Sequence, residues 1–463
     1  MKIVILNISI YYQIVFIRHF FFRLLAKIKF RFQEKDNYER LAFENIVDGK
    51  MAVLLLAGGQ GTRLGVNFPK GMYEVGLLSG KSLFQLQAER LLKLQRLAEQ
   101  KTGRTCNGGI CWYIMTSEGT INPTVEFFES HNYFGLNPSN VVVFQQGTLP
   151  CFSFEGKMLL ASKHELQRAP DGNGGLYRAL KRDGILEDMR ERGVTFVQLY
   201  CVDNILVRVG DPIFTGYCLS KGAECANKVV PKGFPSEAVG ITCKVDGKYQ
   251  VVEYSEITHK AAECREDDGS LTYCAANVCI HFFTRDFLER VIEEHEPDLI
   301  HHVAKKKIPF IDPASGKLVN PEKVNGIKME KFVFDVFRFS DSDKFAVWEC
   351  VREDEFAPLK NAEGASDFTP THCRNALYAL HQKLVLAAGA KLVDGDGCPA
   401  PLMVSPAAAK DSNNNNNNEE DQDKSPVVAC EVSPLVSYAG EGLEKYYKNK
   451  TVEYPVCLSE LID

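Results

Sequence analysis

Apolar residues run without interruption from Met51 to Ala57, and this pattern predicts a strand buried on both faces, because a half-exposed strand would alternate polar and apolar side chains. Further strands are expected at 111–116, 140–144 and 195–202, with helices between them at 83–100, 123–130 and 175–192. This alternation predicts an α/β fold with a mostly parallel central sheet and helices on both faces. In such a sheet ligands bind beyond the carboxyl ends of the strands.

The pattern changes after residue 227, where the strands look antiparallel. They are expected at 228–230, 239–245, 249–254 and 273–281, and are followed by a helix at 284–295, a loop at 308–320 and strands at 331–339 and 345–350. A turn is expected at Asp246–Gly247. Ser82 and Gln85 have the spacing of a capping box, which places the start of the first long helix at Leu83. The central sheet is therefore expected to be mixed, with its parallel half encoded first.

The two ends of the chain differ from this central pattern. Residues 1–32 are apolar and basic, but polar residues interrupt them, so a membrane-spanning role is not expected and an amphipathic helix is one interpretation. We expect an N-terminal arm at 1–50, a central domain at 51–380 and a small C-terminal domain at 381–463. The asparagine-rich stretch 411–425 predicts a disordered insertion in the last of these.

A glycine-rich turn follows the first strand directly. Gly58, Gly59 and two later glycines leave the backbone free to approach a ligand, and Arg63 and Lys70 add cations, which together predict a site for a nucleoside triphosphate. The spacing departs from the dinucleotide fingerprint, because Leu64 stands at the third glycine position counted from Gly59. A dehydrogenase of the Rossmann type is therefore disfavoured.

Composition narrows the class of partner and the compartment. The formal net charge of −6 argues against a nucleic-acid partner, which usually meets a basic surface. The fifteen cysteines are scattered through apolar segments without a C-x-x-C pair, which favours free thiols in a reducing compartment and thus the cytoplasm. The ten histidines have no metal-ligand spacing, and the adjacent His301 and His302 are interpreted as structural.

Several polar residues are candidates for chemistry, each with a plainer alternative. Asn173, in the loop 171–175, could grip a nucleobase or could cap the following helix. Asp203 follows an apolar strand and is a natural ligand for magnesium, or else a turn residue. The remaining candidates have a surface role as the alternative: Lys328, Lys360, Glu253 and Tyr254.

Ten segments together resemble one enzyme family. They are LAGGQGTRLG, FPKG, FQQG, APDGNGGLYRAL, CVDN, VVEYSE, HHVAKKKIP, NGIKMEKFVFD, REDEFAPLKN and SPLVSYAGEGLE, and they occur in this order across residues 38–463. The chain thereby resembles the eukaryotic UDP-N-acetylglucosamine pyrophosphorylases, or UDP-N-acetylhexosamine uridylyltransferases. The resemblance implies a Rossmann-like nucleotidyltransferase domain with small flanking domains, and transfer of UMP from UTP to N-acetylglucosamine 1-phosphate, with the galactosamine epimer as a further substrate.

The resemblance also implies roles for individual residues. Uridine nucleotide would contact Leu56, Ala57, Gly58, Gly59, Gln146, Gly172 and Asn173; the triphosphate would face Arg63, Lys70 and Lys328; the sugar phosphate would meet Asn173, Glu253, Tyr254, Asn277 and Lys360. Asp203 would hold Mg²⁺ or Mn²⁺. The resemblance implies UTP and an N-acetylhexosamine 1-phosphate as partners. It also implies that the protein is a monomer or a weak homodimer.

The chain departs from the family pattern beside one of these residues. Ala276 stands where the family has glycine, and Ile280 replaces a polar residue before His281. The added methyl group of Ala276 bears on recognition of the acetamido group. Two alternatives to the main hypothesis stay open: a broad-specificity UDP-sugar pyrophosphorylase, and an inactive paralogue that still binds nucleotide.

Overall fold

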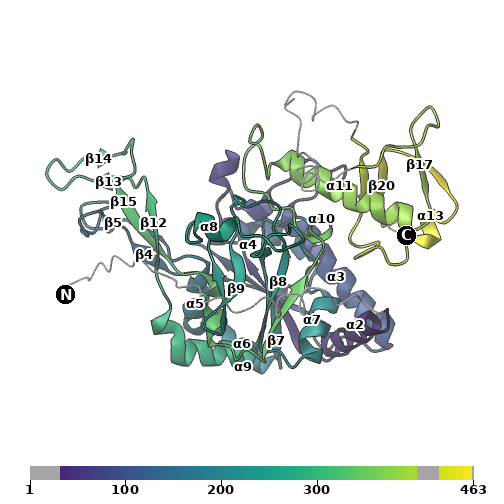
Figure 1. Cartoon of the computed structure of the whole chain (residues 1–463), viewed down its shortest axis with the longest axis horizontal. Coiled ribbons are helices and arrows are strands. Elements are labelled where there is room, and N and C mark those ends of the chain that lie inside the picture. The colour runs from purple at the N-terminus through teal and green to yellow at the C-terminus, as the bar shows by residue number, and fades with distance from the viewer. Residues whose placement is uncertain (1–31, 404–426, 461–463) are drawn as a thin grey trace.

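The computed structural model describes residues 32–403 and 427–460, and Figure 1 shows three bodies side by side: a large central one, an outlying β-rich lobe and a C-terminal lobe. Most of the apolar stretch 1–32 and all of the predicted insertion 411–425 lie outside the described residues. None of the helices in the described ranges is long and apolar enough to cross a bilayer.

A nine-stranded mixed sheet forms the centre of the molecule, in the order β10-β9-β11-β7-β1-β2-β3 with β8 on β11 and β16 on β8. Its strands are β1 Met51–Leu56, β2 Cys111–Thr116, β3 Val141–Gln145, β7 Phe196–Cys201, β8 Cys225–Pro231, β9 Ile241–Val245, β10 Lys248–Val252, β11 Ala275–Thr284 and β16 Phe345–Glu349. β1 pairs in parallel with β2 and β7, whereas β11 is antiparallel to β7 and β8. The predicted division into a parallel and an antiparallel half is confirmed.

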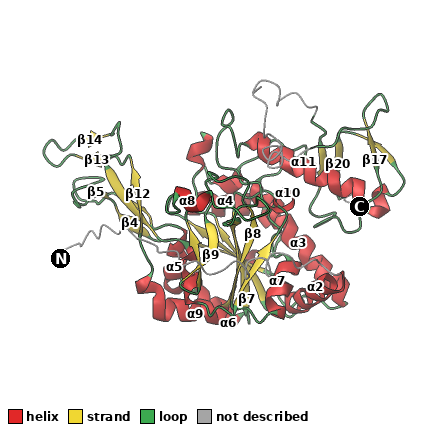
Figure 2. Cartoon of the chain, viewed as in Figure 1, coloured by secondary structure: helices red, strands yellow, loops and turns green. Residues whose placement is uncertain are grey.

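Helices cover both faces of this sheet, as Figure 2 shows in red. They are α2 Phe32–Val47, α3 Leu83–Thr102, α4 Ile121–Ser130, α5 Leu176–Arg182, α6 Ile185–Glu191, α7 Pro212–Ser220 and α9 Arg285–Arg290. Val53 and Leu55 belong to the core with α2, α3 and α7, while Ala52 and Leu54 belong to the core with α5, α6 and α9. Every residue of β1 is buried, so the prediction of a doubly covered strand is confirmed.

Two predicted elements differ from the structure. The helix expected at 175–192 is two helices, α5 and α6, because Gly184 takes a left-handed conformation (φ 69°) between them. The strand expected at 331–339 is wrong: Val333–Phe339 form a 3₁₀ helix. Its buried residues are spaced for a helix, and the Asp335 carboxylate accepts a hydrogen bond from Phe332 N (3.0 Å) at its start. Aromatic and β-branched composition alone suggested a strand.

The predicted turn at Asp246–Gly247 is confirmed, and the predicted capping box at Ser82 is confirmed in part. Asp246 and Gly247 both have positive φ (50° and 80°), as the tight turn between β9 and β10 requires. Ser82 caps α3 by accepting from Gln85 N (3.2 Å), but the Gln85 side chain donates to Glu89 (2.9 Å) rather than back to the cap. The helix therefore begins where predicted with one half of the capping box.

The outlying lobe is built from short strands and the C-terminal lobe from a long helix and strand pairs. The outlying lobe holds the sheet of β12 His302–Lys306, β15 Gly326–Glu330 and β5 Phe152–Ser153, and the pairs β4 Thr148–Pro150 with β6 Arg168–Pro170 and β13 Phe310–Ile311 with β14 Leu318–Val319. The last pair lies within the loop expected at 308–320. α8 His259–Ala262 and α10 Arg352–Glu355 are single turns of the central body.

The C-terminal lobe consists of α11 Pro370–Ala387, α13 Glu444–Tyr447, and the pairs β17 Lys391–Val393 with β19 Thr451–Glu453 and β18 Cys430–Val432 with β20 Val456–Leu458. It has an apolar cluster of its own around Val385 and Leu443. All fifteen cysteines of the chain are free thiols.

Candidate active site

The carboxyl ends of four parallel strands bring the predicted site segments to one edge of the sheet. Leu56, the last residue of β1, is opposite Met115 in β2 and Cys201 in β7. Backbone hydrogen bonds extend both pairings by one residue, from Ala57 N to Met115 O (2.7 Å) and from Val202 N to Leu56 O (3.1 Å). The glycine turn after β1 and Asp203 after β7 therefore leave the sheet as neighbours.

The glycine turn lies against the segment that follows β3. A Cβ atom added to Gly58 would be 3.0 Å from Gln146 Oε1, so the absence of a side chain lets Gln146 close on the backbone. Ser117, after β2, donates to Gly58 O (2.8 Å) and fixes the turn from the other side. Gly59 has open space where a side chain would be, and its neighbour Arg63 is exposed. At Gly59 the turn therefore leaves room for a ligand to approach the backbone.

Asp203 lies between two lysines from distant parts of the chain. Its Oδ2 atom is 3.0 Å from Lys360 Nζ and 3.9 Å from Lys70 Nζ. Lys70 also donates to Leu359 O (2.9 Å), and Leu359 N donates to Asp203 O (2.8 Å). The segment 359–360 is thereby bonded to both the glycine-turn side and the β7 side of the site.

The electrostatics of this group favour an anionic ligand. Burial opposes ionisation of Asp203, but Lys360 and Lys70 outweigh it and lower the pKa of the carboxyl. Burial lowers the pKa of Lys70 despite Asp203, and Asp203 raises the pKa of Lys360. Two ammonium groups share one carboxylate, so one positive charge is left over before Arg63 is counted.

The loop 171–175 is held by the backbone at the end of β15. Asn173 Oδ1 accepts from Val333 N (3.0 Å), and Gly174 N donates to Lys331 O (2.8 Å). Gly172 has φ 85° and lies directly against the Lys331 backbone. No side chain caps the helix here, so the alternative of a capping role for Asp171 or Asn173 is wrong. Only the Oδ1 atom of Asn173 is used in this bond to the described residues.

Asp171 connects this loop with the segment after β3. Asp171 N donates to Gly147 O (3.1 Å), one residue beyond Gln146. Its Oδ1 atom is buried without a hydrogen-bond partner among the described residues, and burial raises the pKa of this carboxyl. The glycine turn, the segment after β3 and the loop 171–175 are therefore joined side by side. Together they carry Gly58, Gln146, Gly172 and Asn173.

Glu253 and Asn277 approach each other through Gly240. Asn277 N donates to Gly240 O (2.8 Å), and a Cβ on Gly240 would lie 2.8 Å from Glu253 Oε1. Burial first, and then the charge of Glu256, raise the pKa of Glu253 to about 7. Tyr254 is 54% exposed, and Lys360 is close enough to act on the charge of Glu253.

Ala276 and Ile280 are core residues of β11. Ala276 is opposite Val230 of β8 and is fully buried, and Ile280 is 1% exposed. Asn277 lies at the irregularity in the pairing with β8, where its Oδ1 accepts from Cys279 N (3.0 Å). The methyl group of Ala276, the residue before Asn277 in the same strand, packs into the apolar core.

His302 is a residue whose role the sequence analysis missed. In β12 its ring stacks on Phe332 (centroids 4.2 Å apart) and lies between Asp335 and Glu256, at 3.1 Å and 3.3 Å. The adjacency of two histidines hid this, because the carboxylate partners are 33 and 46 residues away. The HHVAKKKIP segment within the family resemblance was the available signal.

Lys328 is set apart from the other candidates. It is opposite Ala304 in the sheet of β12, β15 and β5 and is half-buried. Within residues 32–403 and 427–460, no hydrogen bond or ion pair of its ammonium group joins it to Asp203, Lys70 or Lys360. Its role as a phosphate contact stays a prediction.

Comparisons with known proteins identify the family of this chain. Residues 27–392 match the family model described as UTP–glucose-1-phosphate uridylyltransferase. The UDP-N-acetylhexosamine pyrophosphorylase-like protein 1 of Xenopus tropicalis is 53% identical over 90% of this chain and 78% of its own length. UDP-N-acetylglucosamine diphosphorylase 2 of Arabidopsis thaliana is 44% identical over 92% of this chain and 79% of its own.

A solved structure extends the likeness to three dimensions. The uridine diphosphate N-acetylglucosamine pyrophosphorylase of Trypanosoma brucei, in complex with an inhibitor, superimposes with a TM-score of 0.75 at 31% identity, covering 91% of this chain and 80% of that one. The dehydrogenase alternative is thereby excluded. The chain belongs to the UTP–glucose-1-phosphate uridylyltransferase family, among the UDP-N-acetylhexosamine pyrophosphorylases.

Proposed function

We propose that this chain transfers UMP from UTP to N-acetylglucosamine 1-phosphate, giving UDP-N-acetylglucosamine and pyrophosphate, with the galactosamine epimer as a second substrate. The observation that carries the proposal is the position of Asp203 between Lys70 and Lys360, beside an open glycine turn, in a chain of this family. The free thiols support a reducing compartment, and we infer the cytoplasm. We expect a monomer or a weak homodimer.

The reaction needs alignment and charge neutralisation rather than a covalent nucleophile. A phosphate oxygen of the sugar phosphate attacks the α-phosphorus of UTP, and the bond from that phosphorus to the bridging oxygen of pyrophosphate breaks. Both reactants are anions, so cations must hold them together. In this proposal Arg63 and Lys70 bind the triphosphate, and Lys360 binds the attacking phosphate.

Mg²⁺ or Mn²⁺ fits this site with one protein ligand. Within the described residues no group of three or more His, Cys, Asp or Glu side chains could hold a metal ion by itself. Magnesium in nucleotide sites is commonly bound by one or two carboxylates together with substrate phosphates and water, and Asp203 can supply the carboxylate. When bound, the ion would neutralise charge on the leaving pyrophosphate.

The remaining roles follow from which groups are free. Gln146, Gly172 and Asn173 would bind the uracil edge and ribose, with the backbone of Leu56, Ala57, Gly58 and Gly59 beneath the nucleotide. Glu253, Tyr254 and Asn277 would accept and donate hydrogen bonds to the sugar, which Asn173 would also contact. Lys328 would hold phosphate near the departing pyrophosphate.

A second candidate function concerns the sugar alone. A broader UDP-sugar pyrophosphorylase that accepts non-acetylated sugar phosphates is motivated by the departure of Ala276 and Ile280 from the family pattern. Both side chains are buried in the core, so they would act on the sugar only through the position of Asn277. An inactive paralogue is less well supported, because Lys70, Asp203 and Lys360 are all present and in contact.

Pyrophosphate release from UTP with a panel of sugar 1-phosphates tests these alternatives. The main proposal expects a much higher kcat/KM for N-acetylglucosamine 1-phosphate than for glucose 1-phosphate. Equal values would favour the broad-specificity enzyme. UTP binding without turnover on any member of the panel would instead establish the paralogue.

A further inference from the structure

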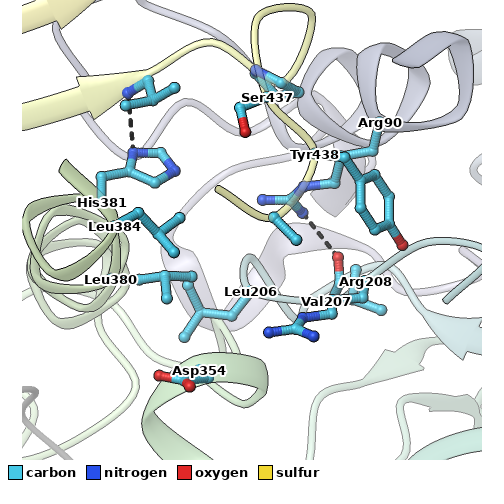
Figure 3. A pocket seen from close by; sticks show the side chains of 13 residues that line it. Arg90, Leu206, Val207, Arg208, Asp354, Leu380, His381, Leu384, Ser437 and Tyr438 are labelled. Atoms are coloured by element: carbon cyan, nitrogen blue, oxygen red, sulfur yellow. Dashed lines mark hydrogen bonds between the residues drawn. The ribbon is translucent and has the colours of Figure 1, made fainter. Parts of the chain in front are cut away.

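A small cavity lies where the C-terminal lobe meets the central body, away from the glycine turn. Its volume is about 40 Å³, and its walls come from α3, the loop 206–208, α10, α11 and the segment 432–439. Figure 3 shows the side chain of Arg90 reaching into it from α3, with His381 on the facing side. A water in such a space occupies roughly 10–15 Å³, so two or three waters or one small ion would fill it.

Arg90 is the unusual group in this cavity. It is 7% exposed, and its Nη1 atom donates to Val207 O (3.1 Å). That bond uses one of the five guanidinium N–H groups, and no carboxylate of the described residues lies within ion-pair distance of Arg90. Burial lowers the pKa of Arg90 to about 10, so the group is still a cation at neutral pH. A buried cation without a counterion is costly.

The charged side chains near the cavity do not neutralise the positive charge of Arg90. Lys228 is bonded to Asp211 and Glu355, and Arg208 Nε is 3.8 Å from Glu355, so these two cations and two carboxylates balance. Asp354, on the cavity wall, is 2.7 Å from Lys383 Nζ. Glu89, the carboxylate whose charge acts on Arg90, is 2.6 Å from Lys81 Nζ, so none of these carboxylates is paired with Arg90.

The facing histidine contributes a second donor. His381 Nδ1 accepts from Val432 N (3.1 Å), so its proton is on Nε2. Figure 3 shows the bonded nitrogen turned toward the strand and the other turned toward Arg90. Burial and then the charge of Arg90 lower the pKa of His381 to about 3, against a hydrogen bond with the Cys430 backbone, so the ring is neutral.

We propose that this cavity binds one small tetrahedral oxyanion of the inorganic phosphate class, held by the free edge of Arg90 and by His381 Nε2. A planar guanidinium presents paired N–H groups that match two oxygens of such an ion. The cavity is too small for a sugar phosphate or a nucleotide. Because its walls come from both bodies, the bound ion would fasten the C-terminal lobe to the central body.

This site does not rest on the proposed function. The test is the melting temperature of the full chain in increasing sodium phosphate, sodium sulfate or sodium chloride at matched ionic strength. UTP and magnesium are present throughout without sugar phosphate, so that the proposed active site is occupied. The expected result is a saturable rise with phosphate and with sulfate, and none with chloride.

Two variants on one helix sharpen the test. Arg90→Met removes the charge at similar volume and should abolish the rise, whereas Arg96→Met, whose side chain is 53% exposed, should retain it. Arg90→Lys keeps the charge without the planar fork and should weaken phosphate binding by about tenfold or more. Should Arg90→Met not fold, the lysine variant and phosphorus NMR titration of the wild-type chain take its place. Equal responses to chloride, an unchanged response in Arg90→Met or Arg90→Lys, or no saturable phosphate binding would overturn the proposal.

Discussion

His302 Nε2 lies 3.1 Å from both carboxylate oxygens of Asp335, so a strand of the outlying lobe is bonded to the 3₁₀ helix at the edge of the central body. The other ring nitrogen is 3.3 Å from Glu256 Oε1. Glu256 in turn accepts from Glu253 N (3.4 Å), and the 3₁₀ helix that contains Asp335 begins at Val333, whose N–H donates to Asn173 Oδ1. His302 therefore connects two segments that we propose to contact the sugar.

Replacing this histidine should weaken sugar binding selectively. His302→Gln keeps a polar side chain but cannot carry the charge that faces Asp335 and Glu256. We expect the KM for the sugar 1-phosphate to rise by about tenfold while the KM for UTP changes little, measured by initial rates of pyrophosphate release. His301→Gln, on the adjacent residue, is the matched control. A parallel rise in both KM values would mean that His302 supports the fold generally.

The same residue predicts a change at alkaline pH. Burial opposes the charge of His302, but Asp335 and Glu256 outweigh it and raise the pKa to about 9. The ion pairs are therefore complete below the ordinary histidine pKa and are lost as the pH rises through about 9. The KM for the sugar phosphate should rise over that range in the wild type and stay flat in His302→Gln. A wild-type profile that is flat to pH 10 would contradict this.

The raised pKa of Glu253 predicts a second change in the KM for the sugar phosphate, at acidic pH. Its pKa is raised to about 7, chiefly by burial, so the carboxylate form is lost as the pH falls through about 7. If the carboxylate accepts hydrogen bonds from sugar hydroxyls, the KM for the sugar phosphate rises below that pH. Glu253→Gln should raise this KM at all pH values and remove the acidic limb. A limb that persists in the variant would assign it to another group.

The cations around Asp203 should matter for the chemical step. Lys360→Ala and Arg63→Ala should each reduce kcat by about a hundredfold or more, because each removes charge stabilisation worth about 3 kcal/mol in the transition state. Lys344→Ala, whose side chain is 50% exposed, is the control and should be unaffected. Wild-type rates in both site variants would refute the assignment of these residues.

Asp203 should control the metal requirement. Asp203→Asn preserves shape but removes the carboxylate charge, so more magnesium should be needed for half-maximal rate and kcat should fall by about a hundredfold. The measurement is the rate as a function of magnesium concentration at saturating substrates. An unchanged magnesium dependence would show that the ion is held elsewhere.

Gly172 should be intolerant of any side chain. Its φ is 85°, and a Cβ atom would collide with the backbone of Lys331. Gly172→Ala should therefore lower both the free energy of unfolding and the affinity for UTP. Gly193→Ala is a matched control with φ 74° and open space around the added atom, so it should cost only about 1–2 kcal/mol of backbone strain. Equal losses in the two variants would mean that the contact with Lys331 is unimportant.

The parallel half of the sheet and its ligand edge could be predicted from the sequence. All residues from Met51 to Ala57 are apolar, which predicts a strand buried on both faces. A glycine-rich turn directly after such a strand predicts a ligand-binding backbone. These signals are local, because strand periodicity and backbone freedom depend on near neighbours. They led to Gly58, Lys70 and Asp203, which the structure brings to one edge.

Other features were beyond local reasoning. The run 333–339 has the composition of a strand, but it forms a 3₁₀ helix whose first N–H groups are bonded by Asn173 and by Asp335 within the run itself. The choice between the period of a strand and the period of a helix depended on which side chains are buried, and burial cannot be read from the sequence.

The sequence by itself determined which backbone would be buried and which would be free, because apolar runs and glycine turns act over a few residues. Only the tertiary structure decided that Lys360 reaches Asp203 across 157 residues and that His302 bonds two acidic segments. It also decided that Arg90 is buried with no carboxylate of the described residues within ion-pair distance. Charge pairing depends on distance in space, and distances between remote segments are fixed by the packing of the whole chain.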